Sequence, residues 1–64
     1  MTGNEFREWR QRMGFTRIKA AEVLGLGRNQ PGHYEEDRRA VPRYVALACA
    51  AVCMGVPPYG KPSE

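Results

Sequence analysis

The sequence predicts an all-α domain of four, and at most five, short helices, and three observations predict it. Apolar residues recur at the three- and four-residue spacing of a helix, residues that start and stop helices separate these runs, and no stretch alternates like a strand. The 64 residues leave room for one domain. We expect it to occupy residues 1–54, followed by a Pro- and Gly-rich extended tail over residues 55–64.

The first helix is expected from about Glu5 to Met13. Phe6, Trp9 and the last residue of this range form one apolar stripe. Thr2 stands three residues before Glu5, which is the spacing of a capping box, and Gly14 is a natural stop.

The second helix is expected to begin after Thr16, a favourable N-cap, and to end at Gly25. Ala20, Ala21 and Leu24 form its inner side. Because two of these residues are small, another helix can cross closely over this one.

The third helix is expected from about Arg28 to Glu36, with Tyr34 as its large inward residue. Pro31 complicates this prediction, because proline lacks an N–H and restricts the residue before it. If Pro31 lies in the first helical turn, the helix starts late, near Asn29 or Gln30.

The fourth helix is expected from about Pro42 to Met54 and is apolar on every face. A surface helix of a monomer normally has a polar side, so we expect a second copy of the chain to cover this one. The expected interface residues are Ala50, Ala51 and Met54. As the alternative, the tail folds back and Tyr59 covers the helix.

Charge and cysteine content narrow the class of protein. Ten Lys and Arg against seven Asp and Glu give a net charge of +3, which many proteins share. However, eight of the ten bases are Arg, whose planar fork suits phosphates and guanine edges. Cys49 and Cys53 share one helical face and are expected to be small core residues of a reduced, cytoplasmic protein.

Several other classes of protein are not expected. The polar N-terminus predicts no signal peptide, and the longest apolar run is too short to span a membrane. One His and two distant Cys give no metal-ligand spacing. No nucleophile–base arrangement or phosphate loop is present, so an enzyme, a cofactor and a small-molecule effector are not expected.

The segment from Thr16 to Tyr34 carries the functional prediction. It pairs two short helices across a tight turn at residues 25–27 and leaves Arg28, Asn29 and Gln30 facing outward. Arginine reads guanine edges, whereas asparagine and glutamine read adenine. These residues are therefore candidates for reading bases in double-stranded DNA.

Here the chain resembles the Cro/C1-type (phage repressor-like, XRE-like) helix-turn-helix family over roughly Phe6 to Met54. The matching elements are Phe6-x-x-Trp9-Arg10-x-x-Met13-Gly14-Phe15-Thr16, Ala20-Ala21-x-x-Leu24-Gly25-Leu26, Tyr34-Glu35, and Pro42 followed by Val45-Ala46-Leu47-Ala48. The resemblance implies a lambda-repressor-like fold and sequence-specific binding to double-stranded DNA. In the position of Pro31 the family normally has Ile or Val.

The resemblance also implies roles for single residues. It implies that Arg28, Asn29 and His33 read bases, although His33 fits a solvated surface position equally well. The residues implied to contact the DNA backbone are Thr16, Arg17, and Arg38, Arg39 and Arg43 in the segment from Arg38 to Arg43. As the alternative, Arg38 and Arg39 balance the acidic run over residues 35–37. Arg10 and Glu35 match a structural ion pair.

These expectations describe a homodimeric repressor that binds an inverted-repeat operator through the major groove. The chain looks like a small regulator of a phage or mobile element, including the anti-CRISPR-associated repressors. The alternative is an antitoxin or another protein-binding module with the same fold.

Overall fold

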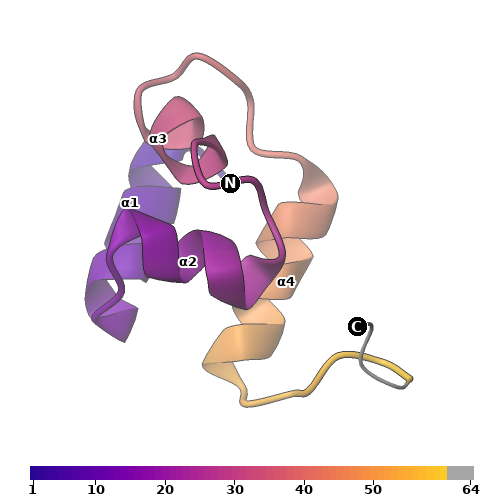
Figure 1. Ribbon diagram of the computed structural model, residues 1–64. Coiled ribbons are helices and arrows are strands. Elements are labelled where there is room, and N and C mark those ends of the chain that lie inside the picture. The colour runs from indigo at the N-terminus through magenta and orange to yellow at the C-terminus, as the bar shows by residue number, and fades with distance from the viewer. Residues whose placement is uncertain (61–64) are drawn as a thin grey trace.

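A computed structural model describes residues 1–60 and contains four α-helices in that part of the chain (Figure 1). These are α1 (Gly3–Met13), α2 (Arg17–Leu24), α3 (Gln30–Glu35) and α4 (Arg43–Cys53). No strand occurs in this range, so the predicted all-α class is confirmed. The last four residues of the expected tail lie outside the described residues.

The predicted caps are present at both ends of α1 and α2. Thr2 Oγ1 accepts from the backbone N–H of Glu5 at 3.0 Å, and Glu5 Oε1 accepts from the N–H of Thr2 at 2.7 Å, which completes a capping box. Thr16 caps α2 with a single bond, in which its side chain accepts from the backbone N–H of Lys19. Gly14 and Gly25 end these helices with φ of 75° and 72°, left-handed values that glycine adopts without steric cost.

The boundary of α3 corrects the sequence prediction. The helix begins at Gln30 and not at Arg28, so Arg28 and Asn29 lie in the turn before it. Pro31 lies in the first turn of α3, where the N–H that proline lacks has no partner within the helix. A start near Asn29 or Gln30 was expected if Pro31 lies in the first helical turn, and the structure has this later start.

The core is built around aromatic rings from α1 and α3. Phe6 lies with its ring centre 5.6 Å from that of Trp9 and 5.5 Å from that of Tyr34. Trp9 Nε1 donates to the backbone carbonyl of Cys49 at 3.1 Å and thereby ties α1 to α4. Ala20 on α2 is fully buried in the same cluster, as its small size predicts.

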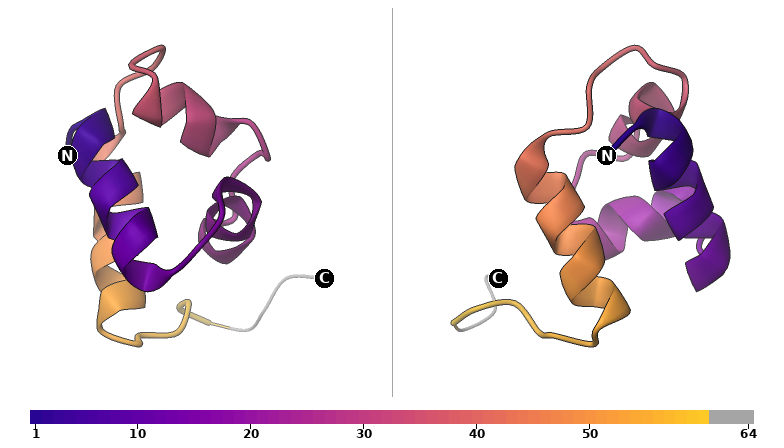
Figure 2. Two further views of the ribbon diagram at one scale, coloured as in Figure 1. Left: turned by 90° about the vertical axis from the view of Figure 1, so that its left-hand side faces the viewer. Right: turned by 180° about the vertical axis from the view of Figure 1, so that it is seen from behind.

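The four helices pack around this core. Both α1 and α2 pack against α3 and against α4 (Figure 2). Residues 55–60 then leave the end of α4 without forming a helix. Within residues 1–60, no helix combines the length and apolarity needed to cross a bilayer.

The side of α4 that faces away from α1 and α2 is apolar and exposed. Tyr44, Leu47 and Met54 are 67%, 60% and 78% exposed. Tyr59 is also fully exposed, so its side chain does not cover this helix. We call this surface the outer face of α4; its residues are Tyr44, Leu47, Ala50 and Met54. Ala51, which was also expected in the interface, is half-buried and lines a hollow with Val23 and Leu24 of α2.

The two cysteines of α4 have different surroundings, which corrects the expectation that both lie in the core. Cys49 is buried, and this burial, together with the nearby Cys53, raises the pKa of its thiol to about 11. Cys53 is exposed near the end of α4. Helical spacing alone placed both thiols on one face, but in the last turn of α4 it is Val52, and not Cys53, that packs against the core.

Candidate nucleic-acid interface

The start of α2 and the beginning of α3 meet at an open hollow of about 410 Å³. We call it the basic hollow, because three arginines line it. The residues that line it are Arg17, Arg28, Asn29, Gly32, His33, Glu36 and Arg38.

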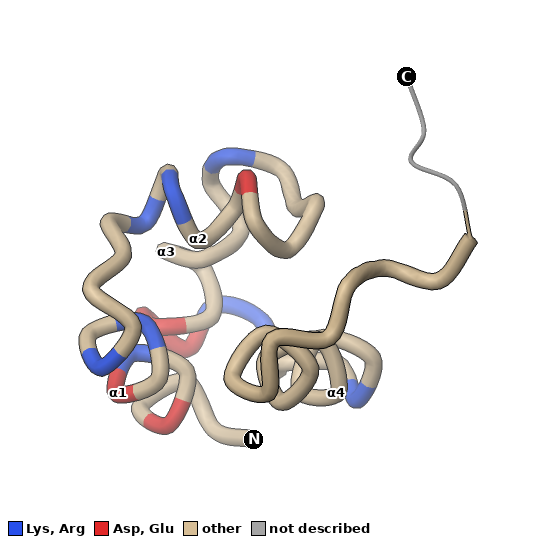
Figure 3. Tube along the Cα trace, turned by 90° about the horizontal axis from the view of Figure 1, so that it is seen from below, with Lys and Arg blue, Asp and Glu red and all other residues tan. Residues whose placement is uncertain are grey.

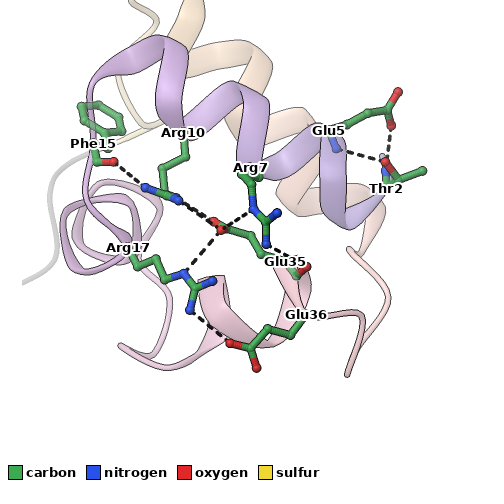
Figure 4. A network of polar contacts seen from close by, with 8 residues as sticks. All are labelled: Thr2, Glu5, Arg7, Arg10, Phe15, Arg17, Glu35 and Glu36. Atoms are coloured by element: carbon green, nitrogen blue, oxygen red, sulfur yellow. Dashed lines mark hydrogen bonds and ion pairs between the residues drawn. The ribbon is translucent and has the colours of Figure 1, made fainter.

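Behind the basic hollow, a buried carboxylate fixes α3 against α1. The side chain of Glu35 is fully buried, and its two oxygens accept from Arg10 Nε at 2.7 Å and from Arg10 Nη2 at 3.1 Å (Figure 4). Arg7 Nε donates to the same carboxylate at 3.3 Å, and Arg17 Nε at 3.4 Å. Arg10 and Glu35, the residues expected to form a structural pair, are therefore the centre of a four-residue network.

The charge of Glu35 is maintained by these arginines. Burial alone would raise the pKa of this carboxyl, but the hydrogen bonds and positive charge of Arg10, followed by Arg7 and Arg17, outweigh it and lower the pKa. Glu35 is therefore an anion at neutral pH. Its charge holds the end of α3 on α1 and orients the side chain of Arg17.

Arg17 reaches from the first turn of α2 across the surface of α3. A Cβ atom on Gly32 would lie 3.1 Å from Arg17 Nη1, so the absence of a side chain at this position makes room for the guanidinium. Arg17 Nη1 donates to Glu36 Oε2 at 3.2 Å. The other oxygen of Glu36 pairs with Arg38 Nε at 3.2 Å, so Glu36 bridges two arginines of the basic hollow.

Three other side chains that line the hollow, those of Arg28, Asn29 and His33, take no part in these ion pairs. Arg28 and Asn29 are exposed, and within residues 1–60 neither side chain makes a hydrogen bond or an ion pair. His33 is half-buried, and its Nδ1 is buried without a hydrogen-bond partner in that part of the chain. Arg28, Asn29 and His33 were all predicted from the sequence, and the fold brings them to one place.

Other predicted residues lie outside the hollow. Gln30 is half-buried, and Thr16 Oγ1 accepts from the backbone N–H of Lys19 at 3.0 Å as the cap of α2. Arg39 and Arg43 are exposed on the segment that leads from α3 into α4. They do not line the hollow.

Sequence reasoning missed two lining residues, Gly32 and Glu36. A glycine within a short helix is costly relative to alanine, by roughly 1 kcal/mol, and this cost was a readable signal for a close contact at Gly32. Glu36 belonged to an acidic run that resembles an ordinary solvated surface. Only the position of Arg17 distinguishes it from that surface.

Charge is distributed unevenly over the chain. Within residues 1–60, Lys and Arg lie on α1, on α2, in the turn between α2 and α3, and from the end of α3 to the first residue of α4 (Figure 3). Residues 44–60 contain no charged residue. In residues 1–60, no three His, Cys, Asp or Glu side chains form a group that could hold a metal ion.

This arrangement suits an anionic ligand that also presents hydrogen-bonding edges. Guanidinium groups bind phosphate oxygens and guanine edges, while an amide matches adenine. The hollow is open and lined by polar groups, so its chemistry fits an extended polar surface more closely than a small apolar ligand. Comparison of the chain with protein-family models, with curated proteins and with solved structures finds no match.

Proposed function

We propose that the chain is a sequence-specific double-stranded DNA-binding regulator that acts as a homodimeric repressor. The observation that carries the proposal is the pair of exposed and unbonded side chains, Arg28 and Asn29, at the edge of the basic hollow. In the major groove, arginine donates to guanine O6 and N7, and asparagine pairs with adenine N6 and N7. His33 and Gln30, which lie on α3 directly after this pair, are further candidates for base contacts.

The remaining arginines supply contacts that do not depend on sequence. Arg38, Arg39 and Arg43 are exposed on the segment that leads into α4. Contacts of this kind to DNA phosphates fix the register of a protein on the duplex, whereas base contacts specify the sequence. We assign these three arginines, with Arg17 at the start of α2, to the DNA backbone.

The dimer is supported by the outer face of α4. Exposed apolar patches on small proteins mark association surfaces, and Tyr44, Leu47 and Met54 expose most of their surface here. A two-fold axis through this face gives two equivalent recognition segments. An inverted repeat would then present half-sites about 34 Å apart, or a multiple of that distance.

In the simplest mechanism, the protein represses transcription only by occupying the DNA of the promoter. A dimer bound across a promoter excludes the polymerase from the same stretch of DNA. The proposal therefore assigns neither catalysis nor an effector ligand to this chain.

The test begins with selection of duplexes from a randomised pool by the purified protein. We expect an inverted-repeat consensus to emerge. Arg28→Ala should relax one position of each half-site and cost about 1–3 kcal/mol in binding. Arg43→Ala, as the comparison, should weaken binding to all duplexes alike and lower the salt slope by about 1.

Two results would contradict the proposal. Unchanged sequence preference in Arg28→Ala would remove that residue from base recognition. Failure of the wild-type protein to bind any duplex at low salt would overturn the function as a whole. Co-purification of a toxin from the native operon would in that case support the antitoxin alternative.

The dimer is tested separately by mass in solution. Ala50→Glu places a charge on the outer face of α4 and should convert dimers to monomers in light scattering. Gln11→Glu adds the same charge at an exposed position of α1 and should leave the mass unchanged. If both variants remain dimeric, the interface lies elsewhere.

A further inference from the structure

The three arginines of the basic hollow are not equally available to a ligand. Arg28 makes no ion pair within residues 1–60, whereas Arg17 and Arg38 are both bound to the carboxylate of Glu36. Arg17 is 40% exposed, Arg38 68% and Glu36 42%, so this bridge lies at the surface. Any anion that enters the hollow meets a carboxylate already in place.

A carboxylate and a DNA phosphate present similar groups to arginine. Both are anionic and accept charge-assisted hydrogen bonds through two oxygens, which is the geometry that a guanidinium fork matches. Glu36 thus uses the two guanidinium groups in the way that a backbone phosphate would use them. The two ligands cannot hold the same N–H groups at once.

We propose that Glu36 is an internal competitor for DNA phosphate in the basic hollow. This inference rests on the proposed function and assigns to Glu36 the opposite role from the arginines around it. When the DNA backbone enters, Arg17 and Arg38 exchange the carboxylate for phosphate oxygens. Binding is weaker than it would be with the two arginines unpaired.

The local structure makes this exchange feasible. The backbone N–H of Glu36 donates to the carbonyl of Gly32 at 2.9 Å, so the end of α3 fixes the residue while its side chain stays at the surface. Exposed ion pairs are weak and are screened by salt. Glu35, in contrast, is fully buried and holds three arginines, one of which is Arg17. Arg17 therefore keeps its anchor when Glu36 is displaced.

The competition acts on every duplex in the same way. Phosphate contacts carry no direct sequence information, so Glu36 lowers affinity for operator and non-operator DNA alike. Non-operator sites outnumber an operator by about a millionfold or more in a genome, and weak backbone binding limits how much protein they retain.

The experiment compares two variants with the same change in charge. Glu36→Gln removes the competitor, and Glu8→Gln removes an exposed carboxylate on α1 that does not line the hollow. Binding is measured to the selected duplex and to an unrelated duplex of equal length. At about 50 mM salt we expect Glu36→Gln to tighten both complexes about three- to tenfold and to steepen the salt slope by about 1. Glu8→Gln should change affinity less than about twofold, because within residues 1–60 Glu8 neither lines the hollow nor pairs with Arg17 or Arg38.

A second arm separates competition from a general charge effect. In the Arg17→Gln, Arg38→Gln background, Glu36→Gln should tighten binding no more than Glu8→Gln does, because no arginines remain to be released. Circular dichroism and thermal unfolding confirm that each variant is folded.

The outcomes distinguish this inference from the function on which it rests. If the wild-type protein binds no duplex, both the proposed function and the competitor role of Glu36 are wrong. If it binds but Glu36→Gln matches Glu8→Gln or weakens binding, only the competitor role is overturned. A gain that persists without Arg17 and Arg38 also overturns it.

Discussion

Glu35 and Glu36 are neighbours in the chain and both accept from Arg17, but their surroundings are opposite. The side chain of Glu35 is fully buried, and that of Glu36 is 42% exposed. In a buried site, removing one partner leaves the other charge without solvent or counter-ion, whereas an exposed pair exchanges readily with water and salt. Two adjacent glutamates that both pair with arginine therefore have different roles. Glu35 holds α3 against α1, whereas Glu36 forms a surface contact that can be exchanged for another anion.

The largest expected effect is the loss of the buried carboxylate. Glu35→Gln leaves Arg10, a mostly buried side chain, without its counter-charge and should lower the free energy of unfolding by about 3–5 kcal/mol. A domain of this size has little more stability than that, so much of the variant should be unfolded at room temperature. Urea unfolding followed by circular dichroism measures the loss. Glu36→Gln is the matched control and should stay within about 0.5 kcal/mol of the wild type; equal losses would contradict the comparison.

Acid should act on the same carboxylate, to a smaller extent. The folded-state pKa of Glu35 lies below its ordinary value of 4.5, so folding stabilises the ionised form. This stabilisation is fully present above about pH 4.5, near the unfolded-state pKa, and is lost as the pH falls through the lower folded-state pKa. We expect the free energy of unfolding to decrease over that range.

Two measurements check this pH dependence. The side-chain carboxyl carbon of Glu35 should titrate below 4.5 in NMR spectra of the folded protein. Glu5 also has a lowered pKa, chiefly through its hydrogen bond with the Thr2 backbone, so Glu5→Gln serves as the control for its share of the acid effect. Stability that does not change below pH 4.5 would contradict the role of Glu35.

Much of the fold could be predicted because its signals are local. Thr2 and Thr16 cap helices through atoms only three residues away, and Gly14 and Gly25 end helices through their own backbone angles. Such features depend on neighbours that the sequence displays directly. Proline has the same local character, since Pro31 sets the late start of α3 by its missing N–H.

The site could be predicted only in part because its bonds cross between elements. The sequence marked Arg28, Asn29 and His33 as candidates, and the fold gathers them around one hollow. It did not show that Arg17 passes over α3 to reach Glu36, because that contact joins residues 19 positions apart. The exposed position of Cys53 was missed for a related reason, since it depends on which residue of the last turn of α4 faces the core, and that residue is Val52.

A smaller effect is expected at Arg17, the residue that both carboxylates share. Arg17→Gln should lower the free energy of unfolding by only about 1 kcal/mol, because Glu35 keeps Arg7 and Arg10. DNA affinity should fall for all duplexes alike, with the salt slope lower by about 1. Urea unfolding tests the predicted stability, and binding titrations at several salt concentrations test the predicted DNA affinity. A stability loss as large as that of Glu35→Gln would show that Arg17 belongs wholly to the buried network.

The smallest change is a single methyl group at Gly32. By helix propensity, Gly32→Ala should stabilise α3 by up to about 1 kcal/mol. The new Cβ would lie 3.1 Å from Arg17 Nη1, and only the tip of a flexible side chain has to move to accommodate it. We therefore expect unchanged or slightly higher stability together with about two- to fivefold weaker binding to every duplex, because the guanidinium of Arg17 shifts from its present route across α3 and its phosphate contact weakens. This is opposite to the effect of Glu36→Gln, which leaves that route open and removes the competitor.

The control uses the Arg17→Gln background, in which the methyl group has no guanidinium to displace. Gly32→Ala should there leave the remaining DNA affinity unchanged, and a further loss would mean that the methyl group itself obstructs the DNA.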